Sequence, residues 1–97
     1  MKTGLELIRK ERENQISKGR SIEKDIQINK DKQLLDASVL LMLYEDQAQY
    51  SDYEYHECVP DGWDLDIWVK MCRKPYIERL SIAGALVSAE IDRLLNQ

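Results

Sequence analysis

Charged and amide side chains recur at helical spacing in two segments that are far apart in the chain. Glu11, Arg12 and Gln15 lie in the first segment, and Glu90 and Arg93 lie in the second. Residues three or four positions apart share one face of a helix, so each segment presents a small polar cluster. If the two helices pack together, the clusters meet at their junction, where buried charges need partners. Two interpretations stay open: an inter-helix salt-bridge network, or the polar floor of a ligand pocket.

The two tryptophans stand close together after a turn, in the stretch PDGWDLDIW. An indole can stack on a flat ring, and arginine or lysine can meet a phosphate. Trp63, directly after the turn, is a candidate lid. Trp68 is a candidate core residue or a second stacking partner. The cations that could meet an anionic ligand are Arg12, Arg20, Lys70, Arg79 and Arg93.

An alternative chemistry is magnesium-dependent hydrolysis of nucleotide pyrophosphates by an all-α enzyme of the MazG-like kind. Such a site needs carboxylates three or four residues apart on one helix face. Here Glu11 and Glu13 are two residues apart, as are Glu90 and Asp92, so each pair points to different sides of its helix. The one histidine, His56, lies in an acidic segment, and no nucleophile–base pair is visible. We predict no catalytic residue and keep this enzyme as an alternative.

Cysteine and histidine are too scarce to predict a disulfide framework or a metal centre. Cys58 and Cys72 are the two cysteines, and we interpret them as reduced thiols in a cytosol. The alternation of Glu54, His56 and Cys58 offers too few ligands for a metal. We therefore expect no metal and no cofactor.

Charge is distributed unevenly along the chain, whose formal net charge is −4. Residues 45–66 hold eight acidic and no basic side chains, whereas the segments on either side are mildly basic. Without a continuous basic stripe to displace counterions, direct nucleic-acid binding is not expected. No apolar run approaches about 18 residues, so we expect no membrane span. The charged residues near position 1 do not resemble a signal peptide, and we expect a cytoplasmic protein.

Hydrophobic patterns predict a single all-α domain over residues 1–97, a small bundle of three long helices and one short helix. Thr3 and Glu6 form a capping box, Asp64 can cap the short helix, and Pro75 suits the first turn of the last helix. We expect helices over about 3–18, 31–46, 64–71 and 75–95 and an acidic loop over 47–62. Residues 19–29 are expected to form a connector that could hold one helical turn after Ser21.

The last of these helices carries the clearest apolar stripe. Its members are spaced three or four residues apart and predict a core seam: Leu80, Ala83, Val87, Ile91 and Leu94. The small residues around Gly84 would let another helix approach closely. Residues 37–43 are apolar nearly all round, which is typical of a central helix or one buried against another subunit. We therefore predict a homo-oligomer.

The stretches KERENQISKGR, PDGWDLDIW and RLSIAGALVSAEIDRLL resemble a family of small all-helical phage and prophage proteins. The family motifs are Glu-Arg-x-x-Gln-Ile, here residues 11–16, a Trp-rich segment after a proline, and Ala-Gly-Ala-Leu-x-x-Ala-Glu-Ile-x-Arg, here residues 83–93. The likeness covers most of the chain outside 45–58. The chain departs from the family at Arg20, where an aromatic residue is usual, and at Gly62-Trp63, which replace a Trp-Pro-Trp-like element. The resemblance implies a phage or prophage origin and no settled activity.

Together these features favour a phage-encoded, non-enzymatic binder of a small anionic ligand. A nucleotide or cyclic nucleotide that serves as a host-defence signal would fit, and the protein would sequester it. The expected ligand-binding residues are Glu11, Arg12, Gln15, Arg20, Trp63, Trp68, Lys70, Arg79, Glu90 and Arg93. A further alternative is an interaction protein that blocks a host protein through the tyrosines of the acidic loop, Tyr50, Tyr53 and Tyr55.

Overall fold

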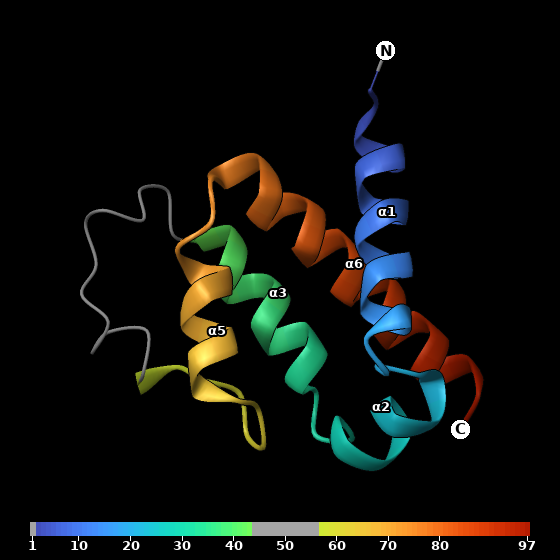
Figure 1. Cartoon of the computed structure of the whole chain (residues 1–97). Helices are drawn as coiled ribbons and strands as arrows, with labels where there is room; N and C mark the ends of the chain where they lie inside the picture. The colour runs from blue at the N-terminus through green and yellow to red at the C-terminus, as the bar shows by residue number, and fades with distance from the viewer. Residues whose placement is uncertain (1, 44–56) are drawn as a thin grey trace.

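The computed structural model describes residues 2–43 and 57–97, and over these ranges the chain is all-helical (Figure 1). The predicted all-α class is confirmed. The helices are α1 (Gly4–Ser17), α2 (Ile22–Ile28), α3 (Gln33–Leu43), α5 (Leu65–Cys72) and α6 (Tyr76–Leu95). None of them is both long and apolar enough to cross a membrane. Most of the predicted acidic loop, with its tyrosines and with Glu54 and His56, lies outside the described residues.

Side-chain caps begin three of the helices. The side-chain oxygens of Thr3, Ser21 and Asp64 accept hydrogen bonds from backbone N–H groups three residues later, at 3.2, 3.2 and 3.0 Å. Each bond satisfies a donor that has no partner inside its helix. The cap at Ser21 begins α2. The sequence predicted this region as a connector that could hold one helical turn after Ser21, and the structure extends that turn to Ile28.

The long helix α6 is the element on which the others are arranged. α1, α2 and α3 all contact it. α3 runs beside it and α1 crosses its C-terminal half (Figure 1). Gly84 makes the crossing possible, because a Cβ at this position would lie 2.7 Å from Cδ1 of Ile8. The close helix approach expected around Gly84 is confirmed.

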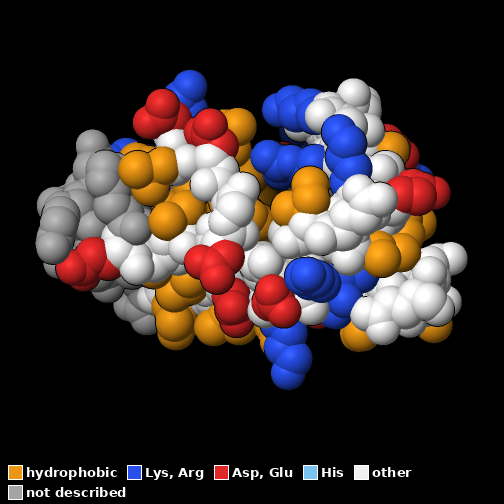
Figure 2. Space-filling model, turned by 90° about the horizontal axis from the view of Figure 1, so that it is seen from below, with side chains coloured by type: hydrophobic (Ala, Val, Ile, Leu, Met, Phe, Trp, Pro, Cys, Tyr) orange, Lys and Arg blue, Asp and Glu red, His pale blue; other side chains and the backbone are white. Residues whose placement is uncertain are grey.

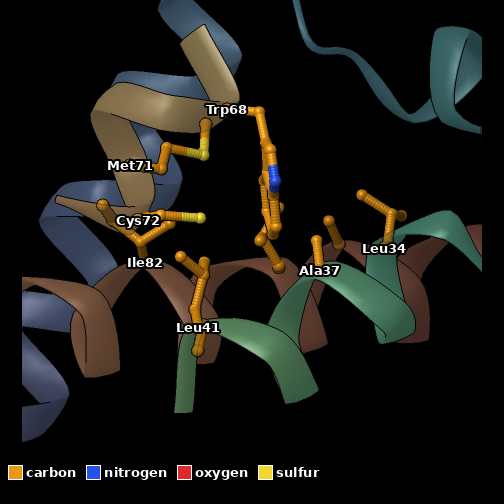
Figure 3. Close-up of a cluster of buried hydrophobic side chains, with 10 residues drawn as sticks. Leu34, Ala37, Leu41, Trp68, Met71, Cys72 and Ile82 are labelled. Atoms are coloured by element: carbon orange, nitrogen blue, oxygen red, sulfur yellow. The ribbon is translucent and has the colours of Figure 1, made fainter. Parts of the chain in front are cut away.

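The hydrophobic core lies between α3, α5 and α6, and Trp68 fills its centre (Figure 3). The indole of Trp68 is fully buried, and side chains of α3 and α5 point toward it from both sides. Leu34, Ala37 and Leu41 come from α3, and Met71 comes from α5. Within the chain, Trp68 is therefore a packing residue of the core.

The apolar stripe predicted as the core seam of α6 is wrong for the single chain. Of its five members only Ala83 is buried, and the others keep between 38% and 56% of their surface exposed. The neighbouring row turns inward instead: Arg79, Ile82, Leu86 and Arg93. The two arginines can face inward because each has a partner. Arg79 donates to the carbonyl oxygen of Leu41 in α3 at 2.9 Å.

Candidate ligand pocket

A pocket of about 170 Å³ opens between α2, the turn before α5 and one face of α6. An apolar cavity of about 150 Å³ can hold a benzene ring, so this pocket has room for one flat ring. Six hydrophobic side chains line it: Ile28, Leu34, Trp63, Ile67, Leu86 and Ala89. Six polar side chains complete the lining: Gln15, Arg20, Lys24, Asp25, Asn29 and Asp64. A largely apolar hollow with a few converging polar groups is typical of ligand sites.

The burial of the lining residues distinguishes the floor of the pocket from its mouth. Leu86, Asp25 and Gln15 are buried, with exposed fractions of 1%, 3% and 6%. Arg20 is half-buried and Lys24 is exposed, so the cations lie toward solvent. In the view from below, most Lys and Arg side chains lie on the right half of the molecule, and most Asp and Glu side chains lie at its centre and left (Figure 2).

The indole of Trp63 is fixed in one wall of the pocket. Its ring meets that of Trp68 edge to face, with centroids 6.0 Å apart and planes at 80°. Its Nε1–H donates to Oδ1 of Asn29 at 2.8 Å. Edge-to-face packing and a satisfied N–H are what a buried indole prefers. The indole of Trp63, which we predicted as a candidate lid, is therefore held in the wall of the pocket.

Asp25 is the buried acid of the pocket. Its Oδ1 accepts a hydrogen bond from Nδ2 of Asn29 at 2.8 Å, whereas its Oδ2 has no partner among the described residues. Burial raises the pKa of Asp25 above its usual value, and the Asn29 bond and the nearby cations Arg12 and Arg20 oppose that rise. The burial of this unpartnered oxygen therefore destabilises the folded protein.

At the junction of α1 and α6, the predicted polar cluster is present but consists mainly of ion pairs. Arg12 donates to Oδ2 of Asp92 at 3.1 Å, which joins the two helices. Arg93 donates to both carboxylate oxygens of Glu90, at 2.6 and 3.1 Å, within α6. The Nε and Nη1 atoms of Arg12 are buried without a partner in the described part of the chain.

The pocket brings together three of the residues that the sequence pointed to, namely Gln15, Arg20 and Trp63. Arg12, Glu90 and Arg93 lie in the ion pairs beside it, and Glu11 is half-buried on α1. The other three lie elsewhere. Trp68 is in the core, Lys70 is exposed on α5, and Arg79 bonds to the backbone and lies 5.2 Å over the ring of Tyr76.

Four polar lining residues were missed: Lys24, Asp25, Asn29 and Asp64. Asp64 was recognised only as a helix cap. The other three lie in or beside α2, in the segment expected to be a connector. The sequence allowed a helical turn after Ser21, and the signal that was missed is Asp25 and Asn29 four residues apart on one face of that turn.

The chemistry available in this pocket is hydrogen bonding, ion pairing and ring stacking. In residues 2–43 and 57–97 no three His, Cys, Asp or Glu side chains come together as a possible metal site. Burial raises the pKa of the Cys72 thiol to about 12, so this core cysteine is a poor nucleophile.

No family model matches the chain, and neither curated proteins nor solved structures gave a match. The pocket is therefore the main basis for a functional proposal.

Proposed function

We propose that the protein binds a small anionic ligand of the nucleotide class, seats one flat ring in the pocket, and holds the ligand without altering it. The observation that carries this proposal is the pocket itself. Its volume of about 170 Å³ suits a single base, its wall contains an indole, and its mouth carries two cations. This combination of stacking surface and phosphate partners is what a nucleotide requires.

The distribution of charge supports one orientation of the ligand. Arg20 and Lys24 lie toward solvent, so the phosphate is expected at the mouth. The base is expected inside, against Trp63 and Leu86, with Gln15 and Asp25 at its polar edge. A phosphate placed next to the buried carboxylate of Asp25 would be repelled.

The biological setting is part of the same proposal. The resemblance of the sequence to small phage and prophage proteins supports a role in the cytoplasm of an infected bacterium. There the ligand would be a nucleotide or cyclic nucleotide that signals host defence, and binding would remove it from its receptor. A dinucleotide would place one base in the pocket of one copy of the protein and its second base in the pocket of another copy.

We also propose that the protein self-associates through the exposed apolar row of α6. Ile77, Leu80, Val87, Ile91 and Leu94 remain between 38% and 67% exposed. Their separations of three, four or seven residues follow the seam by which two helices pair. A continuous exposed apolar row of this kind marks an interaction surface, and a second α6 offers the matching row.

Native mass spectrometry tests the central proposal on protein purified from bacteria that make defence nucleotides. A bound mass of nucleotide size, released unchanged on denaturation, is the expected result.

Isothermal titration of purified nucleotides then compares two substitutions of a surface cation. Arg20→Ala is expected to weaken binding about tenfold or more, because one ion pair with phosphate is lost. Lys70→Ala, which removes a cation outside the pocket, is expected to leave the affinity unchanged. Equal affinities for both variants, or turnover of the nucleotide, would contradict the proposal.

A further inference from the structure

The buried carboxylate of Asp25 has one oxygen in use and one free. Asp25 is 3% exposed and lines the pocket. Asn29 donates to Oδ1 at 2.8 Å, and no described residue donates to Oδ2. A buried carboxylate oxygen without a donor is costly, so a ligand that brings a donor to this oxygen would be stabilised.

The neighbouring contacts determine which kind of partner the free oxygen can take. The indole N–H of Trp63 can only donate, and it donates to Oδ1 of Asn29. The amide of Asn29 is therefore oriented with its NH₂ group toward Asp25, where it donates to Oδ1. This chain of donors fixes Oδ1 of Asp25 as an acceptor, and in the ionised carboxylate Oδ2 can also only accept.

Gln15 adds an adaptable group beside this fixed acceptor. Its side chain is 6% exposed and lines the same pocket from α1, and no described residue hydrogen-bonds its amide. An amide can present either its oxygen or its NH₂ group, so Gln15 can follow the ligand. An ionised carboxylate only accepts, so Asp25 supplies the discrimination.

We infer that the pocket selects a nucleobase that presents an amino group, and that Oδ2 of Asp25 accepts the hydrogen bond from that group while Gln15 contacts the adjacent edge of the ring. The inference rests on the proposed function and names the ligand class within it. A site that buries a hydrogen-bonding group rejects a ligand that leaves the group unpaired. A hydrogen bond to a charged partner corresponds to about tenfold to a hundredfold in affinity.

Two pairs of nucleotides test the inference by calorimetric titration. Adenosine monophosphate and purine riboside monophosphate differ only in the 6-amino group. Guanosine and inosine monophosphates differ only in the 2-amino group. We expect the amino-bearing member of at least one pair to bind about tenfold to a hundredfold more tightly. Equal affinity within both pairs would overturn the inference and leave the proposed function intact, whereas no binding by any of the four would contradict both.

The substitution Asp25→Asn assigns the effect to its atom. The new amide can still accept from Asn29 through its oxygen, and it then turns an NH₂ group toward the ligand. We expect the preference within the discriminating pair to disappear or reverse. Asp66→Asn is the matched control, because Asp66 is an exposed acid of α5 outside the pocket lining. An unchanged preference in Asp25→Asn would show that another group, such as a water bridged to Arg12, fills the free position.

Discussion

The indole Nε1–H of Trp63 donates a hydrogen bond to Oδ1 of Asn29 over 2.8 Å, and this contact joins the turn before α5 to the end of α2. Asn29 passes the interaction to Asp25, so a single chain of hydrogen bonds runs from one wall of the pocket to its floor. The shape of the pocket and the direction of its acceptor are therefore coupled through one amide.

Substitution of Trp63 by Phe tests this coupling. Phe keeps an aromatic ring in the wall but removes the N–H, so Asn29 loses the donor that orients its amide. We expect the free energy of unfolding to fall by about 1 kcal/mol, measured by urea denaturation. Trp68→Phe provides a comparison in the core, where stability should fall through lost packing while the Asn29 bond stays intact. An unchanged stability of Trp63→Phe would indicate that the bond contributes nothing to the fold.

The buried charge of Asp25 predicts a pH dependence of stability. Burial raises its pKa in the folded protein above the usual value of 3.8, Glu90 adds to this rise, and the Asn29 bond, Arg12 and Arg20 oppose it. Between these two pKa values the folded protein binds more protons than the unfolded chain, so the free energy of unfolding falls as pH rises through that window. Asp25→Asn should remove this contribution and make the ligand-free protein at least as stable at pH 7. Urea titrations from pH 4 to 7 measure it, and parallel curves for the two proteins would contradict the prediction.

The crossing of α1 over α6 predicts a steric effect at Gly84. Gly84→Val places carbon atoms where a Cβ would already lie 2.7 Å from the side chain of Ile8. We expect a loss of about 1–3 kcal/mol in the free energy of unfolding. Ile8→Ala in the same chain should restore part of this loss, because it removes the clashing atoms. A double-mutant cycle measures the interaction between the two substitutions. If the two losses in the free energy of unfolding simply add, the new side chain does not clash with Ile8, because α1 moves away from it.

The exposed row of α6 predicts an oligomer that one charge can dissociate. Ile91 is 52% exposed, so Ile91→Glu leaves the core untouched and places a carboxylate in the proposed interface. Size-exclusion chromatography with light scattering should then show a smaller species with unchanged helical content. Gln27→Glu introduces the same charge at an exposed position of α2 and should leave the mass unchanged. A wild-type protein that is already monomeric would overturn the proposed self-association.

Local signals in the sequence predicted the elements better than the way they pack. Thr3 and Asp64 were recognisable as caps because capping depends only on neighbouring residues. The inward face of α6 was not predictable in this way. Two adjacent rows of α6 both have helical spacing, and the buried row contains Arg79, whose partner is a backbone carbonyl of α3. That partner exists only in the folded chain.

The same limit applies to the pocket. Gln15 and Trp63 were found because polar or aromatic residues stand out within a helix or after a turn. Asp25 and Asn29 were missed because α2 is short and buries an acid, which no apolar pattern reveals. Their burial depends on α6, a helix about 50 residues further along the chain.

The central position of α6 also constrains the order in which the protein can form during synthesis. α1, α2 and α3 all pack against α6, yet the ribosome makes all three before residues 76–95. Helices of this length are marginal in water until they pack. The nascent chain therefore carries its first helices without the surface that they need, and folding must wait until α6 has emerged from the exit tunnel. A ligand of the pocket cannot guide these early stages, because Leu86 and Ala89 supply part of its lining from that last helix.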